Sequence, residues 1–89
     1  MNKDKEITPE ALKKNRSKYI VIDVRDVEEF AEGHIEGAED IPTTRFAEAE
    51  AVGDIPKDKP VVIYCLHRVR SGNILEFLRS KGYTNVQHL

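Results

Sequence analysis

The sequence predicts a single α/β domain with a mostly parallel sheet and helices on its faces. Two apolar runs rich in β-branched residues, at 19–24 and 61–64, are continuous rather than alternating, which is typical of strands covered on both faces. Segments with helical signals separate the expected strands, and this alternation favours parallel pairing. Because 89 residues hold only one core of ordinary size, we expect one domain over residues 1–89.

Local signals place the elements in order along the chain. Thr8 and Pro9 suit the cap and the first position of a helix. Asp26 suits the cap of a second helix, which Gly33 ends, and Gly82 suits the end of the last helix. We expect helices over 9–15, 27–32, 42–49 and 71–81, and strands over 19–24, 38–41, 61–64 and 84–89.

The composition is that of a globular domain without a surplus of positive charge. The chain has 14 Lys and Arg residues against 16 Asp and Glu residues, which gives a formal net charge of −2. A general binder of nucleic acid or of anionic membranes usually carries a basic surplus, so we expect neither partner. No apolar run is long enough to cross a membrane and no secretory signal is visible, so we expect a cytoplasmic location. A protein from which a signal had been removed gives the same pattern.

The segment after the strand at 61–64 holds the residues that suggest chemistry. The chain's single cysteine, Cys65, comes directly after this strand, and ligands of open α/β sheets bind beyond the carboxyl ends of strands. A short loop with Arg68 and Arg70 then leads to a helix, whose first N–H groups and positive dipole end favour a thiolate or a bound anion. From the residues alone, a small buried hydrophobic side chain explains Cys65 as well as a reactive thiol does.

The whole chain, and not only this segment, resembles the rhodanese-like (sulfurtransferase) domain family. Several separate motifs agree with the family in order and spacing from about residue 8 to residue 89. These are Ile-Asp-Val-Arg at 22–25, Glu-Glu-Phe at 28–30, Gly-His-Ile-Glu-Gly-Ala at 33–38, Ile-Pro at 41–42, Tyr-Cys through Arg-Ser at 64–71, and Gly-Tyr-Thr-Asn-Val at 82–86. The resemblance implies a three-layer α/β/α fold.

The resemblance also implies a sulfurtransferase in which Cys65 is the catalytic nucleophile. In the family this cysteine takes sulfane sulfur from thiosulfate or a similar donor, becomes a persulfide, and passes the sulfur to a thiophilic acceptor. The acceptor would be cyanide or a thiol, including one on a thioredoxin-like or sulfur-relay protein.

The same resemblance assigns roles to residues around the loop. Arg70 would bind the sulfonate end of thiosulfate, and Ser71 would cap the following helix. Asp23 and Arg25 would support the loop, and Arg25 can add positive charge at its mouth. The whole loop is expected to bind substrate, through Leu66, His67, Arg68, Val69, Arg70 and Ser71.

The length of the loop separates two related chemistries. Cysteine-based phosphatases and arsenate reductases place an arginine six positions after the cysteine, whereas Arg70 stands five positions after Cys65. The shorter loop fits sulfur transfer better than it fits a tetrahedral oxyanion.

Two departures from the family pattern leave a second function open. Arg68 stands at a loop position where the family often has glycine, which tolerates positive φ and leaves room above the sulfur. The Gly-Gly turn and final helix that usually follow the last strand are also absent from the sequence, so we expect one sheet face to be less covered and the domain to be less stable. Both departures fit a catalytically weak sulfur-carrier or protein-interaction module.

The histidines give weaker signals than the cysteine does. His34, in the Gly-His-Ile turn, is expected to satisfy backbone groups, and His88 has no evident role. His67 is two residues from Cys65 and is a candidate for substrate contact. The sequence shows no further cluster of metal-ligating residues to join Cys65 and His67, so we expect no zinc ion, no other metal and no cofactor.

Overall fold

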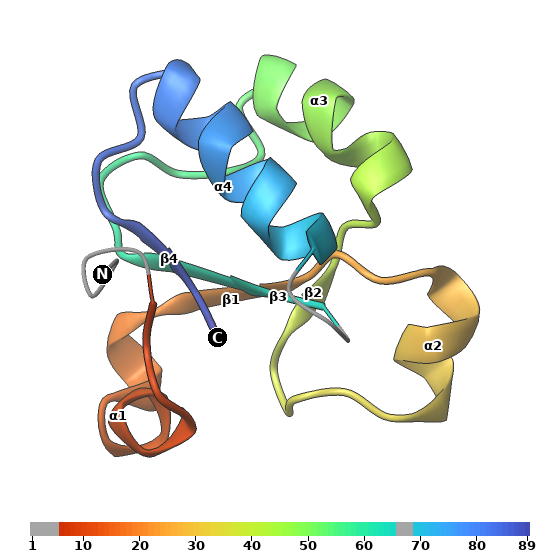
Figure 1. Ribbon diagram of the computed structural model, residues 1–89, viewed down its shortest axis with the longest axis vertical. Helices are drawn as coiled ribbons and strands as arrows, with labels where there is room; N and C mark the ends of the chain where they lie inside the picture. The colour runs from red at the N-terminus through yellow and green to blue at the C-terminus, as the bar shows by residue number, and fades with distance from the viewer. Residues whose placement is uncertain (1–5, 66–68) are drawn as a thin grey trace.

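Four parallel strands form one sheet in the computed structural model, which describes residues 6–65 and 69–89 (Figure 1). The strands lie in the order β2-β1-β3-β4. Their bounds are β1 Ile20–Asp23, β2 Glu39–Asp40, β3 Val61–Tyr64 and β4 Val86–His88. β1 and β3 pair in parallel along their whole lengths, so that their carboxyl ends lie side by side. The predicted α/β class with a parallel sheet is confirmed.

Helices cover both faces of this sheet (Figure 1). α1, Pro9–Lys14, lies on one face and is followed by a 3-10 turn at Arg16–Lys18. α3, Thr43–Ala51, and α4, Val69–Ser80, lie side by side on the other face. The short helix α2, Val27–Glu32, lies beyond the carboxyl end of β1. Within the described residues, no helix is long and apolar enough to cross a membrane.

Each face of the sheet has its own hydrophobic core. Phe46 of α3 and Leu75 and Leu78 of α4 are buried on one face, together with inward side chains of β1, β3 and β4. On the opposite face, Leu12 of α1 packs with Val62 of β3 and its neighbours. The two central strands are therefore covered on both sides, which explains their continuous apolar sequences.

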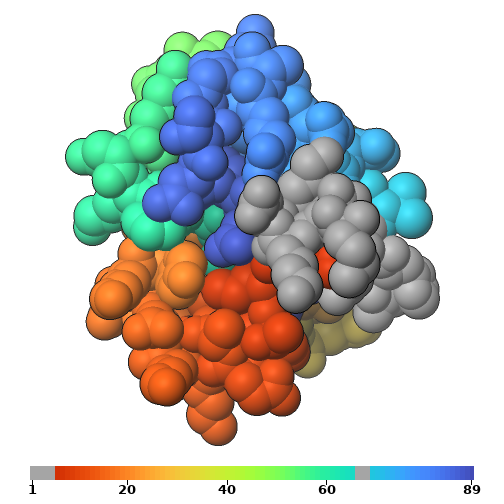
Figure 2. All heavy atoms as spheres, turned by 60° about the vertical axis from the view of Figure 1, so that its left-hand side comes forward, coloured from red at the N-terminus to blue at the C-terminus, as the bar shows by residue number. Residues whose placement is uncertain are grey.

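The two ends of the described chain meet at the outer edge of β4. Glu6 forms an isolated parallel bridge with His88, and the N–H of Ile7 donates to the His88 carbonyl at 3.1 Å. Figure 2 shows the same neighbourhood on the surface, where the red and orange N-terminal segment lies against the blue C-terminal segment. The N-terminal segment thus satisfies part of an edge that would otherwise present unpaired backbone groups.

The helix ends follow the local signals of the sequence. The Thr8 hydroxyl accepts a backbone N–H of α1 at 3.1 Å. At the start of α2, the Glu29 carboxylate accepts the Asp26 N–H at 2.9 Å, which is half of a capping box. After α4, Gly82 adopts a φ of +96°, and the next N–H donates to the carbonyl of Leu78 at 3.1 Å. This geometry is a Schellman turn, for which glycine is the usual residue.

The predicted start of the last helix at residue 71 is wrong. α4 begins at Val69, so Ser71 lies inside the first turn and is not the cap. The first N–H groups of a helix have no partner within it, and that of Ser71 donates to the sulfur of Cys65 at 3.2 Å. A serine near a helix start usually indicates a cap, whereas here its side chain and N–H both face the sulfur.

Candidate active site

Cys65 lies directly beyond the carboxyl end of β3 and faces the first turn of α4. Its side chain is half-buried. The Ser71 N–H donates to Sγ at 3.2 Å, and the Ser71 Oγ lies 3.4 Å from the same sulfur. Hydrogen bonds to sulfur and the start of a helix both favour an anionic sulfur over a neutral thiol.

Ser71 links the sulfur to the last strand. This serine is completely buried, and its Oγ lies 3.0 Å from Nδ1 of His88. His88 is half-buried at the end of β4, and a Cβ on Gly72 would lie 3.9 Å from its Cε1 atom. The ring therefore packs over the first turn of α4, and three side chains from three segments form one chain of contacts.

Arg70 is paired with α2. Its Nη1 and Nη2 atoms donate to the two carboxylate oxygens of Glu29 at 3.0 and 3.3 Å, and Asp26 Oδ1 lies 3.9 Å from Nη1. The guanidinium lowers the pKa of Glu29 to about 2, and the carboxylate in turn raises the pKa of Arg70. This contact joins the start of α4 to the start of α2. It also neutralises part of the positive charge that the sequence predicts beside the sulfur.

Asp23 and Arg25 form a second pair beneath the site. Asp23 is completely buried, and both of its oxygens accept hydrogen bonds from the Arg25 side chain at 2.8 to 3.1 Å. Burial raises the pKa of Asp23, but the hydrogen bonds from Arg25 outweigh it and hold the pKa below its ordinary value. Arg25 also donates to the Gly33 carbonyl at 2.6 Å, which ties the end of α2 to β1. Because this pair is neutral as a unit, Arg25 adds little positive field at the mouth.

The structure brings some of the predicted site residues together and separates others. Cys65 and Ser71 are in contact, whereas the guanidinium of Arg70 is directed to α2. Val69 is 68% exposed at the start of α4. The other predicted substrate-binding residues lie outside the described residues, namely Leu66, His67 and Arg68.

Two residues of the site, Glu29 and His88, were not identified from the sequence. The available signal for His88 was its place at the end of a strand in a parallel sheet, where carboxyl ends converge. For Glu29 the signal was a carboxylate in the first turn of α2, because this helix follows β1, the strand that pairs with β3. His34 holds a turn as expected, with Nδ1 2.8 Å from the Phe30 carbonyl. Among residues 6–65 and 69–89, no group of three or more His, Cys, Asp and Glu side chains is placed to hold a metal ion.

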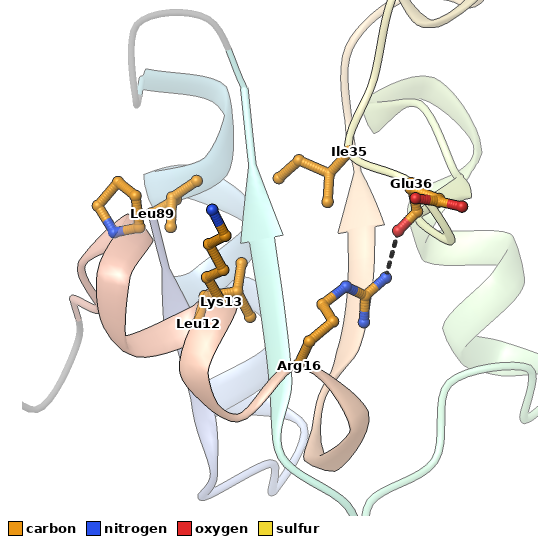
Figure 3. Close-up of a pocket in the computed structure, with 7 residues that line it drawn as sticks. Leu12, Lys13, Arg16, Ile35, Glu36 and Leu89 are labelled. Carbon is orange, nitrogen blue, oxygen red and sulfur yellow. Dashed lines mark hydrogen bonds between the residues drawn. The ribbon is translucent and has the colours of Figure 1, made fainter.

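An apolar pocket of about 540 Å³ opens on the other face of the sheet, beside α1 (Figure 3). Arg16 spans it, and its Nη2 donates to the Glu36 carbonyl at 2.8 Å. The residues that line it are Pro9, Leu12, Lys13, Arg16, Ile35, Glu36 and Leu89. Leu12, Ile35 and Leu89 belong to the hydrophobic core on the α1 face, whereas Cys65 packs against the core on the opposite face, so the pocket is separate from the candidate active site.

Comparison with known proteins identifies the family. The rhodanese-like domain family matches residues 8–89. The uncharacterized protein YqhL of Bacillus subtilis (strain 168) is 39% identical over 85 residues, which cover 96% of this chain and 66% of YqhL. The thiosulfate sulfurtransferase GlpE of Haemophilus influenzae (strain PittEE) is 37% identical over 83 residues, which cover 92% of this chain and 77% of GlpE. The chain thus spans about two thirds to three quarters of the length of these relatives.

A solved structure agrees with these sequence matches. The crystal structure of a rhodanese-related protein from Thermoplasma volcanium superposes with a TM-score of 0.84 at 30% identity. The match covers 94% of this chain and 81% of that one. The sheet order, the position of the cysteine after β3 and the matches across nearly the whole sequence lead to one assignment. The chain belongs to the rhodanese-like domain family.

Proposed function

We propose that this protein is a sulfurtransferase that moves sulfane sulfur from thiosulfate or a similar donor to a thiophilic acceptor through a persulfide on Cys65. The observation that carries the proposal is the placement of Sγ at the end of β3, 3.2 Å from the Ser71 N–H at the start of α4. The similarity to thiosulfate sulfurtransferases named GlpE supports the same chemistry. A free nucleophilic thiol is best preserved in a reducing compartment, so we also propose a cytoplasmic location.

In the first half-reaction, the Cys65 thiolate attacks the outer sulfur of thiosulfate. A sulfur–sulfur bond forms to Sγ, the bond between the two thiosulfate sulfurs breaks, and sulfite leaves with the electron pair. The two thiosulfate charges and the thiolate charge become two charges on sulfite and one on the persulfide. Donors such as the Ser71 N–H stabilise that anionic sulfur.

In the second half-reaction, an acceptor nucleophile attacks the outer sulfur of the persulfide. With cyanide, thiocyanate forms and the Cys65 thiolate is restored; with a thiol, the acceptor leaves as a persulfide. The thiolate is the better leaving group when hydrogen bonds already stabilise it. The same contacts to Ser71 therefore assist both half-reactions.

Arg70 supports donor binding in this proposal. A guanidinium has five N–H donors, and the two contacts with Glu29 use one from each terminal nitrogen. The remaining donors suit the sulfonate oxygens of thiosulfate through charge-assisted hydrogen bonds. Substrate contacts by Leu66, His67 and Arg68 remain predictions.

The direct test follows the mass of the intact protein. Reduced protein incubated with thiosulfate should gain about 32 Da, the mass of one sulfur atom, and cyanide should remove it as thiocyanate. Cys65→Ser should remain unmodified, while Ser17→Ala, a substitution in the turn after α1, should load as the parent protein does. An unmodified parent protein under conditions that load a known sulfurtransferase would contradict the proposal.

A weak sulfur carrier or protein-interaction module is the second candidate, and the pairing of Arg70 with Glu29 favours it because that arginine is already engaged. Steady-state thiocyanate formation should separate the two candidates. If the parent protein and Arg68→Gly both fail to turn over, yet a sulfur-donating partner protein loads Cys65, the carrier function is correct. Turnover by the parent protein that Cys65→Ser abolishes supports the enzyme instead.

A further inference from the structure

The chain of contacts from Cys65 through Ser71 to His88 constrains where hydrogen atoms can lie. Ser71 Oγ is 3.4 Å from Sγ and 3.0 Å from His88 Nδ1. A hydroxyl has one hydrogen and two lone pairs, so it can donate to only one of these two partners at a time. If the Ser71 hydroxyl donates to the sulfur, its contact with His88 is a hydrogen bond only when Nδ1 carries a hydrogen and donates it to Oγ.

Two of the arrangements that satisfy both contacts, each with a hydrogen on Nε2, differ only in where two hydrogen atoms lie. In the first, the Cys65 thiol donates to Ser71, Ser71 donates to Nδ1, and the ring carries its hydrogen on Nε2. In the second, Nδ1 carries a hydrogen and donates it to Ser71, and Ser71 donates to a thiolate. Passing from the first to the second moves one proton from Sγ to Oγ and one from Oγ to Nδ1. The products are a thiolate and an imidazolium, and Ser71 is unchanged.

We propose that His88 is a positioning residue that stabilises the Cys65 thiolate through Ser71, so that protonation of the ring and ionisation of the sulfur are coupled. The proposal rests on the proposed function only in that Cys65 must react as a thiolate. Because Ser71 is completely buried, water does not substitute easily for either of its contacts. The two groups then titrate as a pair, as strongly interacting sites do.

Two charged side chains of the described residues near His88, those of Glu6 and Arg79, are not among the contacts that link Cys65, Ser71 and His88. Glu6, in the segment that pairs with β4, is exposed and bridges to His88 through the backbone. Arg79 of α4 lies at the opposite end of β4, with Nη2 3.4 Å from the Val86 carbonyl. From β3, the neighbour of His88 in register is the apolar Ile63. Ser71 contacts both the ring and the sulfur and can therefore couple them.

The rate of alkylation by iodoacetamide measures the thiolate without any need for sulfur transfer. We expect alkylation of His88→Leu at pH 6.5 to be roughly tenfold slower than that of the parent protein, the size expected for a lost hydrogen bond to an ionised group. His88→Gln can still donate to Ser71 but cannot take up a proton. It should recover part of the rate and lose the pH step that the imidazole produces. His34→Gln, which removes an exposed imidazole in the turn after α2, should match the parent profile.

A double substitution tests the route through the serine. If His88 acts through Ser71, then His88→Leu should have little further effect in a Ser71→Ala background. An equal loss of rate in both backgrounds would show that the ring acts by another path and would overturn the proposal. Superimposable pH profiles for the parent protein and His88→Leu would overturn it as well.

Titration of the ring itself covers the case in which a His88 variant does not fold. In proton–nitrogen NMR spectra, Cys65→Ala should lower the pH at which His88 takes up its proton, because coupling is reciprocal. The His34 signals in the same spectra should not move. An unchanged His88 midpoint refutes the coupling. A protein that fails to load sulfur from thiosulfate but shows this shift would refute the proposed function and leave the coupling intact.

Discussion

Replacing Asp23 with asparagine tests the buried ion pair beneath the site. Asp23 is completely buried and accepts hydrogen bonds from the backbone N–H, Nε and Nη2 of Arg25. Asparagine keeps one acceptor oxygen, but its NH₂ group would lie about where Oδ2 is now, 2.8 Å from Nη2. A donor would then face a donor, and the guanidinium would lose the carboxylate to which it is hydrogen-bonded.

The expected cost is large for a domain of this size. Breaking a buried ion pair by removing one charge costs about 3–5 kcal/mol. We expect about 3 kcal/mol, at the lower end, because Arg25 keeps its bond to the Gly33 carbonyl and its side chain is 15% exposed. For a domain of 60–100 residues, such a loss lowers Tm by roughly 12–24 °C.

Urea unfolding followed by far-ultraviolet circular dichroism at pH 7 measures this cost. Asp58→Asn is the matched control, because Asp58 is an exposed carboxylate in the connector before β3 and its loss should change the free energy of unfolding by less than about 0.5 kcal/mol. Equal midpoints for Asp23→Asn and Asp58→Asn would refute the reasoning. If Asp23 and Arg25 are coupled, Asp23→Asn combined with Arg25→Leu should cost less than the sum of the two single substitutions.

Other predictions concern charge and backbone conformation. The free energy of unfolding should fall as pH drops from 4.5 to about 2, because the lowered pKa of Glu29 means that the unfolded state takes up a proton on this carboxylate at a higher pH than the folded state does. Glu29→Gln should remove that part of the slope in urea midpoints. The rate at which iodoacetate alkylates Cys65, divided by the rate for iodoacetamide, should be higher than the same ratio for a cysteine peptide. This ratio should decrease as the salt concentration rises. The ratio should fall more in Arg70→Ala than in Arg79→Ala, and equal falls would contradict a local field at the sulfur. Gly82→Ala should lower the free energy of unfolding by about 1 kcal/mol, because φ at Gly82 is +96°. Gly72→Ala should raise it by up to about 1 kcal/mol, because Gly72 lies inside α4. A higher Tm for Gly82→Ala than for Gly72→Ala would contradict both expectations.

Elements with strong local signals were predicted closely. The helix at Val27–Glu32 agrees at both ends, because an aspartate cap and a glycine stop are chemical features of neighbouring residues. The strand at Val61–Tyr64 agrees as well, because its burial on both faces produces an uninterrupted apolar run. The three-layer arrangement was predicted from the family resemblance, because neither of these local signals specifies it.

The contacts that join distant segments were not predicted. Arg70 and Glu29 are 41 residues apart, and Ser71 and His88 are 17 apart. No local pattern favours these partners over other charged or polar residues, since the sheet order decides which strand ends lie together. The start of α4 was misplaced for a related reason, because the acceptor for the Ser71 N–H is the sulfur of Cys65, six residues earlier and directly after β3.

The position of β4 affects the order in which the site is completed during synthesis. A nascent chain that has emerged only through α4 already contains Cys65, but it lacks the strand that carries His88 and pairs with both β3 and Glu6. Parallel neighbours pair only after the intervening crossover is complete, and such non-local pairing is slow. Until then Ser71 lacks its 3.0 Å contact with the His88 ring. The chain of contacts from Cys65 through Ser71 to His88 is therefore completed late in biosynthesis, only after residues 86–88 have been made and paired with β3.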